Sequence, residues 1–140
     1  MTPEVMSALY SAAFPDSRPW TATEIAALLN RPTTHAITAP HGFALIQVIA
    51  PEAELLTIVI DPAQQGQGLG RALLDKTLDR AATLGASCLF LEVDMTNAPA
   101  LALYGSAGFE QAGHRANYYV KPDGSRSDAL LLCKALSAAA

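Results

Sequence analysis

The apolar positions of the first thirty residues follow the spacing of short helices. Residues 3–14 carry apolar side chains three and four positions apart, and Thr2 provides an N-cap just before them. Thr21 and Glu24 have the spacing of a capping box at the start of a second apolar stretch, residues 21–30. Two short helices are therefore expected.

The next thirty residues change to runs that are rich in β-branched and other apolar side chains. Such runs occupy residues 35–38, 42–49 and 55–60, and proline or glycine interrupts the chain between them. Short connections favour antiparallel pairing between neighbouring strands. We expect a three-stranded antiparallel meander.

A longer amphipathic helix and a strand come next. Leucine and alanine recur at mixed three- and four-residue spacings over residues 69–84, and Gly85 suits the left-handed position after a helix end. Residues 87–94 then have the pattern of a strand. With the run at 55–60 they form a β-α-β unit, whose strands should pair in parallel.

The remaining residues predict a further helix and a closing hairpin. Asn97 can cap a helix that ends at Gly108, and strand-like arms at 114–120 and 128–134 enclose a polar turn. The whole pattern predicts an α/β protein with a single domain over residues 1–140. Its sheet should be mixed and mostly antiparallel, with a central parallel pair and about four helices.

Composition narrows the class of protein. The 140 residues are 51% hydrophobic, with a net charge of −4 and nine scattered lysines and arginines, which argues against a nucleic-acid surface. Every apolar run is broken before the roughly eighteen residues of a membrane helix, and no export segment is indicated. Cys88 and Cys133 lie in apolar runs, which favours buried reduced thiols over a disulfide or a metal pair. We expect a cytoplasmic protein.

Three closely spaced glycines join the run at 55–60 to the long helix. Gly66, Gly68 and Gly70 allow consecutive backbone N–H groups to turn towards one ligand, and the helix adds unpaired donors and its positive dipole end. A diphosphate would suit these donors. The spacing matches neither the dinucleotide fingerprint nor the Walker motif. An ordinary glycine-rich connection is the alternative.

The strand at 87–94 carries a candidate base. Alternation places Glu92 on one face with Phe90 and Asp94. A carboxylate in partly apolar surroundings has a raised pKa and can act as a general base near neutral pH. The alternative is a glutamate at a strand end that pairs with a lysine or arginine.

Polar and aromatic side chains offer further candidates. Tyr104 follows Asn97 by about two helical turns, so both can face one side of their helix, and the phenol can donate a proton to a leaving group. Asn97 is alternatively a helix cap, and Tyr104 a core aromatic. Trp20, Tyr118 and Tyr119 lie near turns or strand ends, where they either line a substrate groove or cover the core.

An ordered set of short motifs lies within a longer stretch, from about residue 10 to 134, that carries one family resemblance over nearly the whole chain. Its members are Asp61-Pro62, Gln65 to Arg71, Leu91-Glu92-Val93, Asn97, and Ala102 to Phe109. This set resembles the GNAT family of acetyl-CoA-dependent N-acetyltransferases. Within the family, the Leu-Glu-Val strand, residues 115–119 and Asp123-Gly124 most resemble the RimI-type enzymes, which acetylate the N-terminal amine of a ribosomal protein.

The resemblance implies a GNAT fold and roles for individual positions. Glu92 would accept a proton from the amine, through water, and Tyr104 would protonate the departing thiolate, without a covalent enzyme intermediate. Backbone groups of residues 58–60 would hold the pantetheine and acetyl arm, and residues 65–71 the diphosphate. The cofactor-binding set implied in this way is Ile58, Val59, Ile60, Gln65, Gly66, Gln67, Gly68, Leu69, Gly70, Arg71 and Asn97.

Three departures from the family pattern affect these expectations. Gly66 stands where many members have arginine, which we expect to loosen the phosphate loop. Asp94 stands where RimI-type chains often carry a basic residue, which we expect to alter the choice of substrate. The usual first strand is absent ahead of the helix at 3–14, which would shorten one sheet edge.

The leading functional hypothesis is transfer of acetyl from acetyl-CoA to a protein N-terminal α-amine, with a ribosomal-protein alanine as the expected acceptor. An α-amine needs only a modest base, because its reference pKa of ~7.7–8.0 leaves roughly a tenth neutral at pH 7, against under about a thousandth for lysine. The alternatives are a GNAT enzyme acting on a small amine or a lysine side chain, and a non-catalytic acyl-CoA-binding module. We expect no metal, no nucleic-acid or membrane partner, and a monomer or weak dimer.

Overall fold

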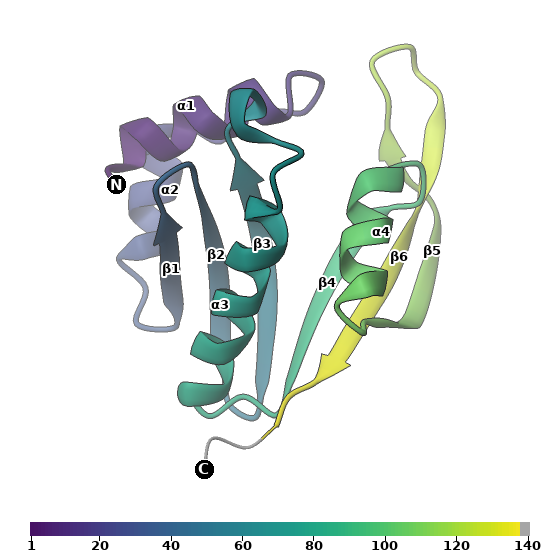
Figure 1. The fold of residues 1–140 in the computed structure, drawn as a ribbon. Coiled ribbons are helices and arrows are strands. Elements are labelled where there is room, and N and C mark those ends of the chain that lie inside the picture. Colours follow the sequence, from purple (N-terminus) through teal and green to yellow (C-terminus); the bar gives the residue numbers. More distant parts are fainter. Residues whose placement is uncertain (138–140) are drawn as a thin grey trace.

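A mixed six-stranded sheet forms the centre of the structure, in the strand order β1-β2-β3-β4-β6-β5 (Figure 1). The computed structural model describes residues 1–137. Its strands are β1 (Thr34–Ala39), β2 (Gly42–Ile49), β3 (Glu52–Ile60), β4 (Cys88–Asp94), β5 (Glu110–Val120) and β6 (Arg126–Ala135). Its helices are α1 (Pro3–Ala13), α2 (Ala22–Leu29), α3 (Leu69–Thr83) and α4 (Ala98–Ser106), with a short 3-10 turn, η1 (Pro62–Gln64).

These elements confirm the predicted fold class. Within residues 1–137 the chain has the expected helices, and no strand precedes α1. The sheet is mostly antiparallel, with one parallel pair in its middle. The predicted domain boundary at residue 140 lies outside the described residues.

Local sequence explains where the first two helices begin. The Thr2 side chain accepts a hydrogen bond from the Val5 N–H at 3.2 Å and so caps α1. The Thr21 hydroxyl accepts from the Glu24 N–H at 3.1 Å, and the Glu24 carboxylate accepts from the Thr21 N–H at 3.4 Å. Both halves of the predicted capping box of α2 are therefore present.

Strand pairing follows the expected topology. β1, β2 and β3 form the antiparallel meander, and β5 and β6 form the closing hairpin. β3 and β4 pair in parallel on either side of α3, which confirms the β-α-β unit. β3 begins at Glu52 rather than at residue 55, because Glu52 to Glu54 pair with both β2 and β4.

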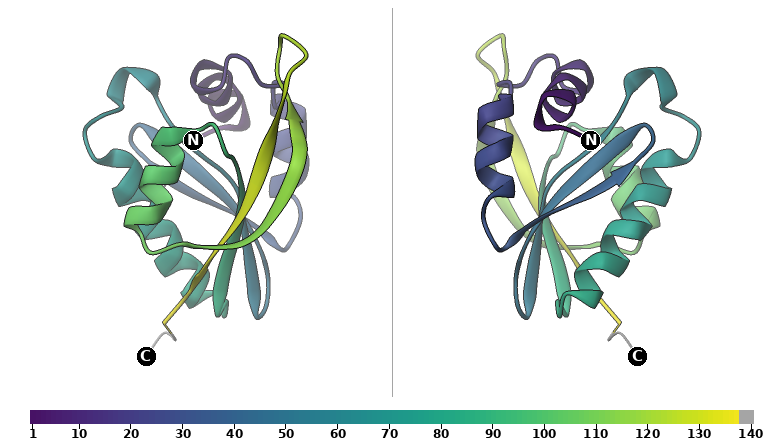
Figure 2. Two further views of the ribbon diagram at one scale, coloured as in Figure 1. Left: turned by 90° about the vertical axis from the view of Figure 1, so that its right-hand side faces the viewer. Right: turned by 90° about the vertical axis from the view of Figure 1, so that its left-hand side faces the viewer.

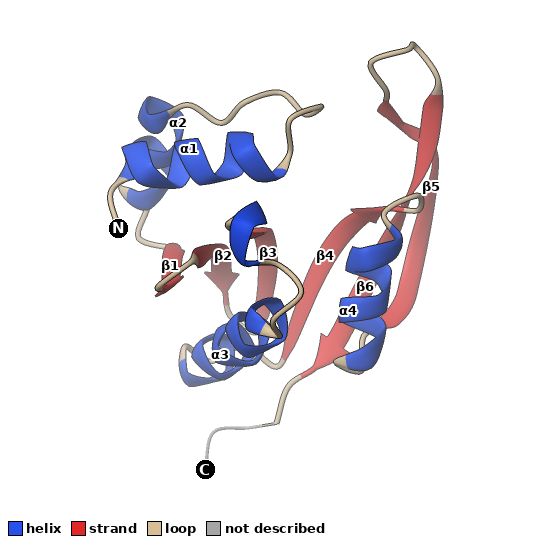
Figure 3. Cartoon of the chain, turned by 45° about the horizontal axis from the view of Figure 1, so that its top comes forward, coloured by secondary structure: helices blue, strands red, loops and turns tan. Residues whose placement is uncertain are grey.

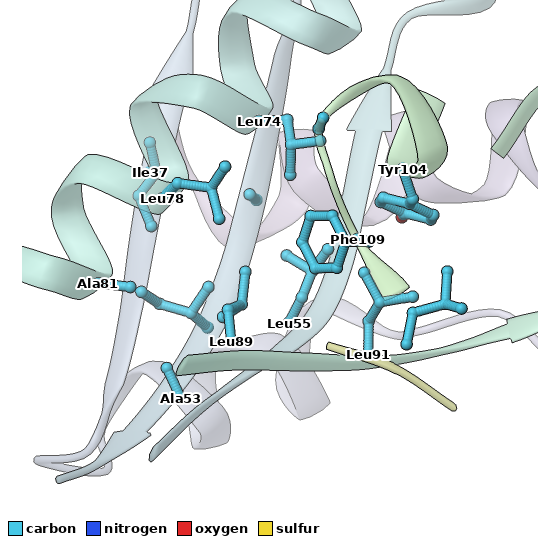
Figure 4. Close-up of a cluster of buried hydrophobic side chains, with 14 of the residues drawn as sticks. Ile37, Ala53, Leu55, Leu74, Leu78, Ala81, Leu89, Leu91, Tyr104 and Phe109 are labelled. Atoms are coloured by element: carbon cyan, nitrogen blue, oxygen red, sulfur yellow. The ribbon is translucent and has the colours of Figure 1, made fainter. Parts of the chain in front are cut away.

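Two hydrophobic cores lie on opposite faces of the sheet. α3 and α4 cover one face, where residues such as Leu74, Leu89 and Phe109 pack together (Figure 4). α1 and α2 cover the other face, where Met6 and Ile25 pack with residues of β2 and β3. The two side views show one pair of helices on each side of the sheet (Figure 2).

One extra residue in β3 changes the face that its later side chains meet. A shift in register against β2 leaves Leu56 as a β-bulge. Leu55, before the bulge, belongs to the core under α3, and Ile58 and Ile60, after it, pack against that same core. Simple alternation would have placed these two isoleucines on the opposite face from Leu55.

β3 and β4 separate part-way along their length. Parallel pairing covers only Glu52 to Glu54 of β3 against Cys88 to Phe90 of β4. The two strands then diverge in a V (Figure 1). Backbone groups on their facing edges are left without a strand partner beyond this point.

Two other sequence-based expectations concern location and thiols. None of the helices within residues 1–137 is long and apolar enough to cross a membrane. Cys88 and Cys133 are free thiols, as expected, but both are only partly buried. The expected burial is only partial because α1 and α2 cover β2 and β3 on that face of the sheet, and not β4 and β6.

Candidate active site

A cleft of about 880 Å³ occupies the opening between β3 and β4. Its walls come from the diverging halves of the two strands, the loop before α3, the start of α4 and the end of β5. Seen with the top of the molecule tilted forward, η1 and α4 stand on either side of this opening (Figure 3). Residues far apart in the sequence therefore meet around one space.

The glycine loop presents free backbone donors to the cleft. Gly66 and Gly68 have φ angles of +81° and +79°, the left-handed region that glycine adopts without strain. Gly68 is the N-cap of α3 and provides no side-chain cap. The first helical bond runs from the Ala72 N–H to the Gly68 carbonyl, so the N–H groups before Ala72 in α3 remain available.

Backbone conformation, and not lack of space, favours glycine at position 66. A Cβ at this position would meet nothing within 4 Å, so space does not exclude a larger side chain. The φ of +81° does disfavour any L-residue there. This loop therefore has a conformation suited to glycine at position 66.

Two side chains of the loop already have partners. Arg71 forms an ion pair with Asp75 at 3.1 Å and donates a hydrogen bond to the Ser106 hydroxyl at 3.1 Å. This places its guanidinium between α3 and α4, beside the cleft that it lines. Gln67 does not line the cleft, and its amide donates to Gln64 at 3.4 Å.

Only two of the three side chains in the predicted cofactor-binding segment 58–60 of β3 line the cleft. Ile58 and Ile60 line it directly. Val59 points to the other face and is 1% exposed in the core under α1 and α2. It can therefore contact a ligand in the cleft only through its backbone.

Glu92 lies on the cleft wall with a cation beside it. Alternation along β4 buries Leu91 and Val93 and leaves the Glu92 side chain 27% exposed, as predicted. Its Oε1 lies 3.4 Å from Nη2 of Arg115, whose guanidinium also stands 5.4 Å from the ring centre of Tyr118. The ion pair named as the alternative is therefore present at a residue that also lines the cleft.

Tyr104 and Asn97 each combine a structural contact with access to the cleft. Tyr104 is 7% exposed and packs edge-on against Phe109, with ring centres 5.5 Å apart (Figure 4). Burial, with a smaller contribution from Tyr119, raises the pKa of Tyr104 to about 12. The Asn97 side chain accepts a hydrogen bond from the Ala100 N–H at 3.2 Å and caps α4. Both residues line the cleft.

Two of the three candidate substrate-binding aromatics, Trp20 and Tyr119, share one hollow beside the cleft, and Tyr118 lies outside it. Tyr119 lines the cleft, and burial followed by the charge of Glu92 raises its pKa to about 12. Trp20 lines an adjoining hollow of about 410 Å³ and stacks on Tyr10 with ring centres 5.2 Å apart. Tyr118 is 46% exposed and lines neither space.

The cleft, the glycine loop and the split strands coincide with a family match. Residues 4–109 match the model of the acetyltransferase (GNAT) family. The chain belongs to the GNAT family. The resemblance drawn from its motifs is confirmed, and the segment matched includes Glu92 and Tyr104.

Individual GNAT relatives agree with this assignment. The chain is 47% identical over 96 residues to the [ribosomal protein bS18]-alanine N-acetyltransferase of Escherichia coli K12, a match that covers 69% of this chain and 64% of that protein. A crystal structure of the ribosomal-protein-S18-alanine N-acetyltransferase from Escherichia coli superposes with a TM-score of 0.82 at 35% identity, over 100% of this chain and 92% of that one. A structure of yncA from Salmonella typhimurium with its cofactor acetyl-CoA shares the fold, with a TM-score of 0.81 at 21% identity over 99% and 90% of the two chains.

The GNAT cleft also contains an ion pair that the sequence did not predict. Asp94 and Lys121 form it at the rim of the cleft, and Thr96 hydrogen-bonds to both. Alternation had placed Asp94 on the face of Glu92, whereas Lys121 reaches the site only through the pairing of β5 with β6. Among residues 1–137, no group of three or more histidine, cysteine, aspartate or glutamate side chains could hold a metal ion.

Proposed function

We propose that this GNAT protein transfers acetyl from acetyl-CoA to the N-terminal α-amine of a protein, and that a ribosomal protein with N-terminal alanine is its acceptor. The observation that carries the proposal is the meeting of Glu92, Tyr104 and the glycine loop around one cleft. The 47% identity to a [ribosomal protein bS18]-alanine N-acetyltransferase supports the choice of acceptor.

The residues of the cleft fit coenzyme A. The left-handed glycines and the free N–H groups at the start of α3 suit the two phosphates, and the helix dipole adds to their attraction. The edge of β3 that is unpaired beyond Glu54 offers N–H and C=O groups to the two amides of the pantetheine arm. Asn97 and the side chains of Ile58 and Ile60 line the path between these regions.

Glu92 accepts the proton that the amine loses as its nitrogen attacks the thioester carbon. A positioned base of this kind contributes roughly 10²–10⁴-fold to the rate. The Arg115 guanidinium, 3.4 Å from Oε1, fixes the direction in which this carboxylate points. Holding amine and thioester in contact supplies much of the remaining acceleration.

Tyr104 acts at the sulfur when the C–S bond breaks. A pKa of about 12 keeps its hydroxyl protonated throughout the neutral range. Full transfer of this proton to a thiolate is uphill, because a free thiol has a pKa of ~8.5. The hydroxyl therefore stabilises the departing thiolate chiefly by donating a hydrogen bond, and solvent completes the protonation.

The acceptor enters from the side of the adjoining hollow, which Trp20 and Tyr119 line. A chain that modifies ribosomal proteins meets them in the cytoplasm, which also suits the free thiols of Cys88 and Cys133.

The test is a coenzyme A release assay with short peptides that begin with a free alanine. We expect release with these peptides and none with the same peptides blocked at the N-terminus, including blocked peptides with an internal lysine. Mass spectrometry should place one acetyl group on the α-amine. Release with small amines or blocked lysine peptides only would support the second enzyme hypothesis. Tight acetyl-CoA binding without turnover on any amine would support a binding module.

A further inference from the structure

Asp94 and Lys121 lie where the cleft meets the adjoining hollow. Both side chains line both spaces. Asp94 ends β4, and Lys121 follows the last residue of β5, so their ion pair connects two elements on the acceptor side. An acceptor that passes from the hollow to Glu92 therefore passes close to this pair.

The two oxygens of Asp94 have different partners. Oδ1 accepts hydrogen bonds from the backbone N–H of Thr96 at 2.9 Å and from its hydroxyl at 2.8 Å. Oδ2 pairs with the ammonium of Lys121. Burial opposes ionisation, but Lys121 and Thr96 outweigh it and lower the pKa of Asp94 to about 2. The carboxylate is therefore charged at every working pH and is held in place by Thr96 even without Lys121.

Lys121 is the more mobile partner of the pair. Its side chain is 34% exposed, against 17% for Asp94, and it has a flexible four-carbon stem. Another cation can therefore replace its ammonium at Oδ2 while the lysine moves into solvent. Such an exchange leaves the half-buried carboxylate of Asp94 paired with a cation throughout.

The position of Asp94 sets which part of an acceptor it meets. Asp94 follows Glu92 by two residues on the same face of β4, a separation of about 7 Å along the strand. An acceptor amine at Glu92 has its next residue within that distance, because an extended chain advances ~3.3 Å per residue. The side chain of the second acceptor residue therefore reaches Asp94.

The charges around the hollow favour a cation in this position. Arg18 is engaged by the Glu24 carboxylate, at 3.1 and 2.7 Å, and Lys121 by Asp94. Asp16 also lines the hollow and forms no ion pair within residues 1–137. An acidic acceptor side chain would find no free cation there and would lie beside Asp94.

From this geometry we infer that Asp94 selects acceptors whose second residue is basic, by exchanging the ammonium of Lys121 for the cation of the acceptor. The inference rests on the proposed α-amine acetylation and adds a charge class to its substrate.

The experiment compares three peptides that begin Ala-Lys, Ala-Gln and Ala-Glu and are otherwise identical. For the unmodified protein we expect kcat/KM to fall in that order, by roughly tenfold from lysine to glutamate, mainly through KM. Asp94→Asn should bring the three values within about twofold of one another. Lys121→Gln should widen the lysine preference, because it frees Oδ2 without removing the carboxylate.

The last two variants separate charge selection from structure. Asp94→Asn and Lys121→Gln break the same ion pair, so a merely structural role predicts the same change in both variants. The inference instead predicts opposite changes in the ratio of kcat/KM between the Ala-Lys and Ala-Glu peptides. Asp123→Asn is the charge control: it removes one aspartate charge from the β5–β6 turn that carries Lys121, outside both spaces, and should leave the ratio unchanged. Turnover of the glutamine peptide without a lysine preference would overturn the inference alone. Absence of turnover with every peptide would overturn the proposed function as well.

Discussion

The two sides of the cleft are built in different ways. The side proposed for the cofactor comes mainly from one continuous segment, β3 to α3, completed by the start of α4, and offers mainly backbone groups. The side proposed for the acceptor combines the α1–α2 connection, the end of β4 and the β5–β6 hairpin, and offers charged and aromatic side chains in pairs. Backbone donors suit a ligand shared by a whole family, whereas paired side chains can be changed singly and so can adapt to a particular acceptor.

The largest effect on kcat is expected from a change to Glu92, the proposed general base, which lies between the two sides of the cleft. Glu92→Gln keeps the shape of the side chain and removes its ability to accept a proton, so kcat should fall by roughly 10³-fold. Steady-state kinetics with an alanine peptide would measure the loss, and circular dichroism would check the fold. Glu110→Gln, on exposed β5, is the control. A rate close to that of the unmodified protein would exclude Glu92 as the base.

A somewhat smaller loss of kcat is expected when Tyr104, the residue proposed to act at the thioester sulfur, is changed. Tyr104→Phe retains the ring that packs on Phe109 and removes only the hydroxyl, so kcat should fall by roughly 10²-fold with little change in thermal stability. Tyr118→Phe removes an equivalent hydroxyl from an exposed ring outside the cleft and should have no comparable effect. Equal rates for Tyr104→Phe and Tyr118→Phe would show that Tyr104 serves only to pack the core and takes no part in catalysis.

The cofactor side can be tested through backbone conformation. Alanine at Gly68 forces an L-residue into a φ of +79°, at a cost of about 1–2 kcal/mol. We expect lower stability and roughly tenfold weaker binding of acetyl-CoA, measured by calorimetry. Gly124→Ala imposes the same strain at a φ of +85° in the hairpin turn. This control should lose stability and keep its affinity; weaker binding in both would point to a general loss of structure.

The smallest effect concerns pH. The pKa of Asp94 is lowered in the folded protein to about 2 from an ordinary value near 4, so its ion pair stabilises the fold above pH ~4, and that stabilisation is lost as the pH falls towards 2. Glu24 titrates in the same range, because its contacts with Arg18 also lower its pKa to about 2. Chemical unfolding of Asp94→Asn should therefore show a shallower loss of stability between pH 4 and 2 than the unmodified protein. Identical slopes would contradict the assignment to Asp94.

The same contrast explains what could be predicted from the sequence. Helix caps, the β-α-β unit and the glycine loop depend on neighbouring residues, so Thr2, Thr21 and Gly68 could be interpreted directly. The alternation that placed Glu92 on a partly open face was equally local.

The acceptor side depends on contacts between distant segments. Arg115 reaches Glu92, and Lys121 reaches Asp94, only because β6 pairs with both β4 and β5. Neither contact has a pattern in the nearby sequence. The bulge at Leu56 was also missed, because it changes register without leaving a glycine or proline as a marker.

β3 is held in an unusual way for a strand with one open edge. Its side chains enter two cores, with Val59 on one face and Leu55, Ile58 and Ile60 on the other, and the bulge at Leu56 makes this division possible. The strand is thus kept extended by packing on its faces rather than by a neighbour on each edge. A ligand arriving at the open edge meets groups that are already in their bound geometry. Little ordering entropy is then lost on binding, and association need not wait for the strand to form.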